Sequence, residues 1–164
     1  MSRSSGRRGV FALTLLLSLG ALGAALVSQH VFDLQPCPWC VLQRVIFALL
    51  ALAAVLGLAW RSVLGMRVAA VIGIVLAALG AAAALWQHAV AAKSASCNLT
   101  LADRIVSGLQ LDSLAPQVFA ATASCADAAV QLFGLPYEYW SLGLFGVLGI
   151  ALAMALVQRH PFAR

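Results

Sequence analysis

Long runs of apolar residues alternate with short polar segments along the whole chain. Four runs, at residues 10–32, 45–60, 68–90 and 139–157, contain no Asp, Glu, Lys or Arg. A helix rises about 1.5 Å per residue and the hydrocarbon core of a bilayer is ~30 Å thick, so a helical run of about 20 residues can cross it. The second run reaches this length when residues 41–44 continue it toward the N-terminus. The pattern therefore predicts four membrane-spanning helices.

The expected fold is an all-α membrane protein, a four-transmembrane-helix bundle with a short outward first loop and a longer outward second loop. We expect one integral membrane domain, residues 1–164, divided into spans at about 10–32, 41–60, 68–90 and 139–157 and outward loops at 33–40 and 91–138. The first run could alternatively belong to a cleaved signal peptide, but its apolar length exceeds the ~7–15 residues expected of one. In the last span, glycines at every third position from Gly143 to Gly149 are expected to let helices pack closely.

The second loop is the only sizeable segment outside the predicted spans. Residues 99–109 and 117–133 each have the apolar spacing of a short amphipathic helix, and polar residues and a proline between 112 and 116 interrupt them. At this apolarity such helices are expected to lie on the membrane surface.

Charge is scarce and unevenly distributed. Only 9% of the residues are charged and 63% are apolar, which is outside the usual composition of soluble domains. Seven of the ten basic residues lie near the termini or between the second and third spans, namely Arg3, Arg7, Arg8, Arg61, Arg67, Arg159 and Arg164. By the positive-inside rule these segments are cytoplasmic, which puts both termini inside and both loops outside. The net charge of +5 then reflects membrane orientation, and no basic tract with interleaved aromatic residues indicates nucleic acid.

All four cysteines fall in the two outward loops. Cys37 and Cys40 are in the first loop, and Cys97 and Cys125 are in the second. An even number of cysteines on the outer side is typical of an oxidising compartment, where disulfides persist. Four cysteines allow three pairings, of which proximity in the sequence favours Cys37 with Cys40 and Cys97 with Cys125. A zinc site is a weaker alternative, because the second pair lacks the close spacing that zinc ligands commonly have, and we expect no metal.

The spacing of Cys37 and Cys40 favours redox chemistry over a structural role. A disulfide between residues three apart closes too small a loop to stabilise a fold much, although inert disulfides that staple the loops are the structural alternative. Pro38 and Trp39 can open the second helix, since proline is favoured in a first turn, and Cys40 then lies near the helix N-terminus. The partial positive charge there favours the thiolate, the reactive form of cysteine.

Arg44 lies four residues after Cys40, on the same helical face and at a depth where an arginine costs free energy. Either it is an interfacial anchor, or it is a fixed cation that holds an anionic or carbonyl-bearing electron acceptor beside the thiolate. The chain has neither G-x-G-x-x-G nor C-x-x-C-H, so the acceptor is expected to come from the membrane. A lipid-soluble quinone, ubiquinone or menaquinone, fits this requirement, with Arg44 and His88 as candidate partners of its carbonyl oxygens.

The main alternative is a haem-binding membrane electron carrier. His30 and His88 lie at the outer ends of the first and third spans, where two imidazoles on facing helices can ligate haem. That function leaves the four outward cysteines unexplained.

Five features follow one another over residues 28–146: SQHVFDLQPCPWCVLQR, HAV near the end of the third span, DSLAPQVF, the second-loop cysteine pair and GLPYEYWSLGLFG. In this order they resemble the DsbB family of bacterial disulfide-forming membrane proteins. The resemblance implies a thiol:quinone oxidoreductase of the bacterial inner (cytoplasmic) membrane with its cysteine loops in the periplasm. It also implies a soluble DsbA-like partner, which the protein reoxidises while it passes the electrons to quinone.

The resemblance further implies a role for each cysteine. Cys37 and Cys40 match the quinone-coupled pair, with Cys40 nearest the quinone and Cys37 exchanging with the second loop. Cys97 and Cys125 match the pair that oxidises the carrier, with Cys97 taking the attack.

Two further positions match the family and two depart from it. Arg44 matches a quinone-interacting arginine, and His88 matches a histidine near the same pocket. Gln43 stands where some members carry an acid, and the pair 38–39 fills a variable position. These departures can tune redox potential or pH dependence without changing the reaction.

Overall fold

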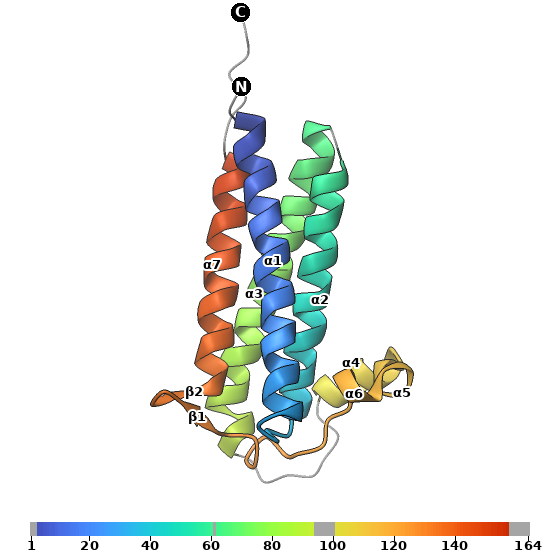
Figure 1. Cartoon of the computed structure of the whole chain (residues 1–164), viewed down its shortest axis with the longest axis vertical. Helices are drawn as coiled ribbons and strands as arrows, with labels where there is room; N and C mark the ends of the chain where they lie inside the picture. The colour runs from blue at the N-terminus through green and yellow to red at the C-terminus, as the bar shows by residue number, and fades with distance from the viewer. Residues whose placement is uncertain (1–2, 61, 94–100, 158–164) are drawn as a thin grey trace, which may run out of the picture.

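The computed structural model describes residues 3–60, 62–93 and 101–157, and four long helices make up most of them (Figure 1). They are α1 (Arg3–His30), α2 (Pro38–Ala59), α3 (Val63–Ala89) and α7 (Tyr137–Val157). All four are long and apolar enough to cross a membrane. The prediction of an all-α, four-helix membrane bundle is therefore confirmed.

Capping residues determine where α2 and α3 begin. Cys37 is the N-cap of α2, and Ser62 is the N-cap of α3, with its hydroxyl oxygen accepting from the backbone N–H of Gly65 at 3.1 Å. Both helices begin a few residues before the apolar runs do, because a cap satisfies the free N–H groups of a first turn whatever its hydropathy.

The long helices alternate in direction along the bundle. The start of α1, the link between α2 and α3 and the end of α7 lie at one end (Figure 1). The α1–α2 link and the described residues between α3 and α7 lie at the opposite end, which we call the cysteine end because Cys37, Cys40 and Cys125 are there. Segments far apart in the sequence thus meet at one end of the bundle.

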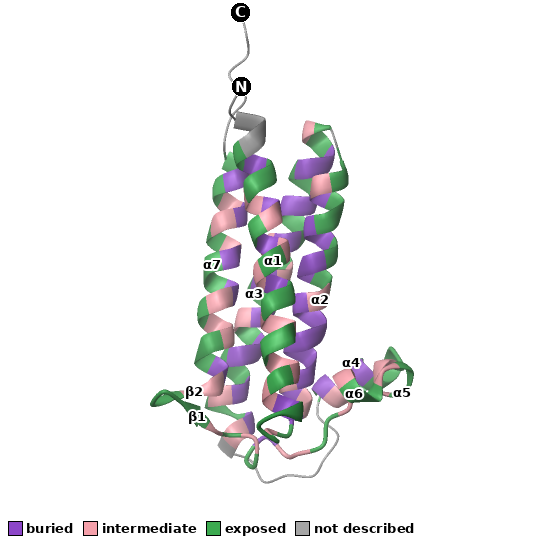
Figure 2. Ribbon diagram, in the orientation of Figure 1, coloured by how far each residue is buried: buried purple, intermediate pink, exposed green. Residues whose placement is uncertain are grey.

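Large side chains fill spaces left by small ones in the core. α3 packs against both α2 and α7, whereas α1 packs mainly against α2 and less closely against α7. The ring of Phe145 lies against Gly80 and stacks on Phe47, with 4.2 Å between the ring centroids. Buried residues face inward along the bundle and the outward faces are exposed and largely apolar, as contact with lipid requires (Figure 2).

The glycines of α7 do not all pack as expected. A side chain added at Gly149 would touch Ala77 at 3.4 Å, but one added at Gly143 or Gly146 would meet no atom within 4 Å. The expectation of close helix packing is therefore wrong for Gly143 and Gly146.

Short helices occupy the first part of the second loop. After a 3₁₀ turn (Ala91–Lys93) they are α4 (Leu101–Gly108), α5 (Leu111–Leu114) and α6 (Pro116–Phe119). α4 packs on α2, where Val106 joins Val41 and Val45 in a buried cluster. The helix predicted over residues 99–109 is confirmed for its described part.

The helix predicted over residues 117–133 is wrong. The chain leaves the helical conformation after Phe119, and the strands β1 (Gln131–Leu132) and β2 (Leu135–Pro136) form an antiparallel hairpin. Phe133 and Gly134 between them have positive φ angles of 54° and 79°, as a two-residue type I′ turn requires. The apolar residues of this segment belong instead to a non-helical chain that crosses the end of the bundle.

Candidate functional site

The C-P-W-C motif forms the first turn of α2. Cys37 has an extended backbone (φ −84°, ψ 166°), and its sulfur accepts a hydrogen bond from the backbone N–H of Cys40 at 3.3 Å. Pro38 follows in the first turn of the helix, where its missing N–H costs nothing. The prediction that the Pro-Trp pair opens the second helix is confirmed.

Three sulfur atoms meet at this turn. The Sγ atoms of Cys37 and Cys40 lie 2.7 Å apart, and Cys37 also shares a hydrogen bond with Cys125. The three described cysteines are free thiols, and Cys37 and Cys125 are buried. Cys37 therefore stands between a cysteine of its own loop and a cysteine of the other loop. Cys97, the fourth predicted site residue, lies outside the described residues.

Hydrogen bonds between the two loops hold Cys125 in this position. The backbone N–H groups of Thr122 and Ala123 both donate to the carbonyl oxygen of Pro36, at 3.0 and 3.2 Å. The hydroxyl of Thr122 also donates to the side-chain oxygen of Gln35 at 2.6 Å. The segment before Cys125 is thus fastened to the segment before Cys37.

The shared hydrogen bond gives the two thiols opposite character. Contact with the sulfurs of Cys125 and Cys40, together with burial, raises the pKa of Cys37 above its ordinary value. The hydrogen bond with Cys37 and a second one from the backbone N–H of Trp39 lower the pKa of Cys125. The surroundings of Cys125 therefore favour its thiolate form more than those of Cys37 do, and Cys37 is the sulfur that Cys125 faces.

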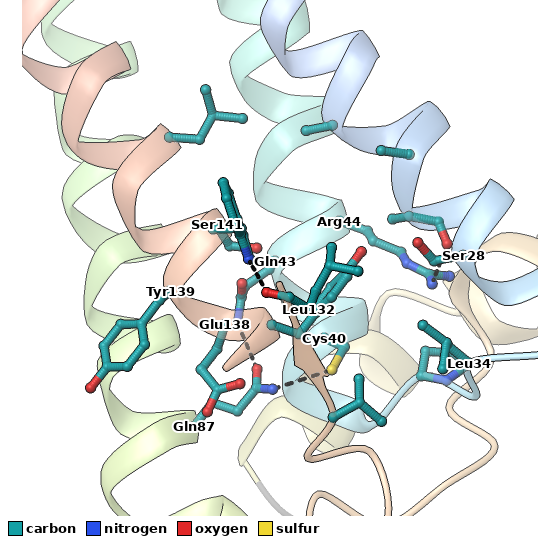
Figure 3. Close-up of a pocket in the computed structure, with 18 of the residues that line it drawn as sticks. Ser28, Leu34, Cys40, Gln43, Arg44, Gln87, Leu132, Glu138, Tyr139 and Ser141 are labelled. Atoms are coloured by element: carbon teal, nitrogen blue, oxygen red, sulfur yellow. Dashed lines mark hydrogen bonds between the residues drawn. The ribbon is translucent and has the colours of Figure 1, made fainter. Parts of the chain in front are cut away.

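A cavity of about 720 Å³ lies next to Cys40, on the side where α1 and α7 pack less closely (Figure 3). This volume is in the range of small-molecule sites. Its walls are largely apolar and include small residues of α1 and α7, such as Ala21, Ala24 and Gly143. Several polar side chains also reach it, including Cys40, Gln43, Arg44, Gln87, Tyr137 and Glu138.

Arg44 lies inside the bundle and connects three parts of the chain. It is buried, and it donates to the side-chain oxygen of Gln29 at 2.6 Å, to the carbonyl oxygen of Val118 at 2.9 Å and to that of Ala25 at 3.2 Å. Among the described residues these bonds occupy three of its five N–H groups. Arg44 thus joins α2 to α1 and α6 and does not extend to the surface as an interfacial anchor would.

Two glutamines complete the polar side of the cavity. The amide nitrogen of Gln87 donates to the sulfur of Cys40 at 3.3 Å, and its oxygen accepts from the amide nitrogen of Gln43 at 2.7 Å (Figure 3). Sequence reasoning did not select Gln87 or Gln29. The available signal was a carboxamide within an apolar predicted span, where its burial costs free energy unless it is hydrogen-bonded.

The two candidate histidines have separate partners. His88 on α3 contacts the carboxylate of Glu138 on α7, with 2.7 Å between Nδ1 and Oε1, and its ring packs on Tyr139. Glu138 lines the cavity, whereas His88 is not among the residues that do. The Nε2 of His30 lies 3.3 Å from the carbonyl oxygen of Gln117. Each histidine thus has a partner of its own and neither lines the cavity, so a shared haem has no support from these contacts, and a quinone contact for His88 stays a prediction.

Comparison with known proteins identifies one family. The family model described as Disulfide bond formation protein DsbB matches residues 7–155. Disulfide bond formation protein B of Cupriavidus metallidurans is 33% identical over 160 residues, which cover 96% of this chain and 97% of the relative. Disulfide bond formation protein B 1 of Pseudomonas syringae pv. syringae is 31% identical over 154 residues, covering 90% of this chain and 89% of the relative. The matches extend over the bundle, the C-P-W-C turn and the second loop.

The lowered pKa predicts how Cys125 reacts in the fully reduced protein. Its thiolate should persist below the ordinary thiol range near ~8.5 and disappear only as the pH falls through the lowered value. Cys37→Ala removes the hydrogen-bond donor and should move the midpoint of Cys125 alkylation to higher pH, while Cys37→Ser retains a donor and should move it less. Alkylation rates across a pH series, measured by peptide mass spectrometry, test this. Equal midpoints in all three proteins would contradict it.

Proposed function

The chain belongs to the DsbB family of membrane disulfide-forming oxidoreductases, and on that premise we propose that it is a thiol:quinone oxidoreductase that reoxidises a soluble DsbA-like carrier and passes the electrons to membrane quinone. One observation carries the proposal. Cys37 contacts Cys125 of the long loop, and its partner Cys40 lines an apolar cavity between the helices. This arrangement connects a loop that a soluble protein can reach with a site that a lipid can reach.

The proposed exchange begins at Cys97 in the oxidised protein. A carrier thiolate attacks Cys97, a mixed disulfide forms and Cys125 leaves as a thiolate. Cys125 then attacks Cys37, the Cys37–Cys40 bond breaks and Cys40 keeps the electron pair at the cavity wall. The lowered pKa of Cys125 and its contact with Cys37 support this order.

The second thiol of the carrier then releases the carrier as a disulfide and frees Cys97. Cys97 attacks Cys125, which re-forms the Cys97–Cys125 bond and leaves Cys37 and Cys40 as a dithiol. This dithiol would return to the Cys37–Cys40 disulfide by giving two electrons and two protons to a bound quinone, so that in total a dithiol and a quinone become a disulfide and a quinol.

The cavity suits a quinone by the chemistry of its lining. Its apolar walls match a ring and a hydrocarbon tail, and the N–H groups of Arg44 and Gln87 match carbonyl oxygens. A quinone bound there would supply an acceptor for two electrons and two protons. The protein's own part is to hold the ring beside Cys40, provide a fixed cation through Arg44 and exclude water. Glu138, whose carboxylate contacts His88, also lines this cavity.

The proposed location is the bacterial inner membrane, with both termini cytoplasmic and both cysteine loops periplasmic. In support, Arg7, Arg8 and Arg67, three of the basic residues that the structure describes, lie on the parts of α1 and α3 opposite the cysteine end, whereas Arg44 and Arg104 lie at that end. We predict that a membrane-impermeant thiol reagent labels reduced Cys97 and Cys125 from outside intact cells. Labelling that occurs only in inverted vesicles would contradict this orientation.

The function itself can be tested with purified components. With detergent-solubilised protein, a reduced DsbA-like carrier and a soluble quinone, we expect the ultraviolet absorbance of the quinone to fall as the carrier is oxidised, in equal amounts. Ubiquinone and menaquinone analogues can be compared in the same assay. Cys40→Ser should stop quinone reduction. Carrier oxidation without quinone reduction, or quinone reduction that survives Cys40→Ser, would overturn the proposal.

Arg44 provides a second prediction about the same site. Removal of a hydrogen bond from a charged donor costs about 1.5–3 kcal/mol, so Arg44→Ala should raise the apparent KM for quinone roughly ten- to a hundredfold. Arg44→Lys should recover only part of the loss, since a point charge lacks the planar donor fork. Disulfide content checks that the variants still insert and oxidise. Unchanged quinone kinetics would limit Arg44 to joining α1, α2 and α6.

A further inference from the structure

We propose that the carboxamide of Gln87, held in orientation by Gln43, stabilises the thiolate that Cys40 becomes when the Cys37–Cys40 disulfide is attacked. The amide nitrogen of Gln87 lies 3.3 Å from the sulfur of Cys40, and all three side chains line the cavity (Figure 3). The inference rests on the proposed function only for the identity of the attacking thiol, Cys125. Gln87 is then a catalytic residue in contact with a reacting atom, and Gln43 is a positioning residue.

Burial fixes the direction in which the Gln87 amide points. Gln87 and Gln43 are only 3% and 4% exposed, so water does not compete for their polar atoms. The oxygen of Gln87 accepts from the amide nitrogen of Gln43 at 2.7 Å, which turns the nitrogen of Gln87 toward Cys40. Reversal of the Gln87 amide alone would bring its nitrogen against the amide nitrogen of Gln43, which is two donors, and its oxygen against the sulfur of Cys40. The pair therefore presents a donor to the sulfur before the reaction begins.

A hydrogen-bond donor at this position stabilises the thiolate of Cys40 more than it stabilises the same sulfur in a disulfide or a thiol. Sulfur in a disulfide or thiol is a weak acceptor, whereas a thiolate accepts a charge-assisted hydrogen bond. A preorganised donor aimed at an atom where charge develops lowers the barrier because it needs no rearrangement. Gln87 does this without adding a net charge to the apolar cavity.

Arg44 is the nearest cation along the helix, but its described hydrogen bonds lead elsewhere. They run to Gln29 and to two backbone carbonyls, so the side-chain N–H that reaches the sulfur of Cys40 belongs to Gln87. Other ionisable groups border Cys40 from its own turn, from the second loop and from α7. They are Cys37, Arg44, Cys125, Tyr137 and Glu138. Neutral substitutions of the glutamines leave all of these in place.

The chemical step involves only this chain. The thiolate of Cys125 forms a bond with the sulfur of Cys37, the Cys37–Cys40 bond breaks and Cys40 keeps the electron pair. No electron leaves the protein and no proton is required. Disulfide exchange is faster when the leaving thiol binds a proton less tightly, so stabilisation of the Cys40 thiolate speeds the step.

The test measures the Cys40 thiolate in fully reduced protein that contains neither quinone nor carrier. Alkylation of Cys40 across a pH series, resolved by peptide mass spectrometry, gives the midpoint of its titration. We expect Gln87→Leu to move this midpoint upward by about 1–2 pH units, since a hydrogen bond to a charged group is lost. Gln87→Asn, whose amide is one carbon too short, should move it in the same direction. The Gln87→Asn variant therefore tests the proposal even if Gln87→Leu does not fold.

A double-variant cycle tests the positioning role. Gln43→Leu alone should shift the Cys40 midpoint upward by less than Gln87→Leu does, and it should add nothing in the Gln87→Leu background. Gln131→Leu, on the exposed strand β1, is the matched control and should leave the midpoint unchanged. An unchanged midpoint in both Gln87 variants would overturn the proposal, as would additive effects of the two glutamines. Because the assay contains no quinone, a failure of the proposed function would appear separately, in the quinone-reduction assay.

Discussion

The rest of the site depends on the contact that Cys37 makes with Cys125 on one side and Cys40 on the other. Thiol–disulfide exchange requires direct attack of one sulfur on another, so the spatial order of sulfurs limits the order of transfer. This contact needs α2 to begin at Cys37 and needs the second loop to return to that point. Hydrogen bonds from Thr122 and Ala123 to Pro36 meet the second requirement. The packing of two loops that are remote in the sequence thus determines that Cys125 contacts Cys37.

The same turn of α2 joins the sulfur contact to the cavity. Cys40 is one turn before Arg44, so one helical face presents both a thiol and a buried guanidinium. Burial of that charge and of two carboxamides in an apolar bundle is costly unless each finds partners. Arg44 is hydrogen-bonded to α1 and α6, and Gln43 on α2 is hydrogen-bonded to Gln87 on α3. These bonds fix the polar groups in place beside an otherwise apolar space.

The sequence predicted the features that depend on local or periodic signals. Apolar length predicted the four long helices, and the proline and cysteine spacing predicted how α2 begins. The predictions that proved wrong depend on contacts between segments that are distant in the sequence. Periodicity predicted a helix over residues 117–133, but bonds to the first loop and a turn at Phe133 and Gly134 replace it.

Small and polar residues within the spans were harder to interpret from sequence. A glycine on a membrane helix can face a neighbour or a cavity, and Gly143 lines the cavity whereas Gly149 contacts Ala77. Gln87 gave a weak signal because its partners, Cys40 and Gln43, are on another helix. The sequence identified Arg44 as unusual, but its bonds to Gln29 and Val118 depend on how α1 and α6 fold back on α2.

The most direct test of this account is a map of the disulfides formed when a carrier with a single thiol is added to the fully oxidised protein. Acid quenching followed by peptide mass spectrometry would identify each bond. The account predicts the carrier on Cys97 and a new bond between Cys125 and Cys37. Carrier attached to Cys37 or Cys40, or an intact Cys37–Cys40 bond beside a free Cys125, would contradict it.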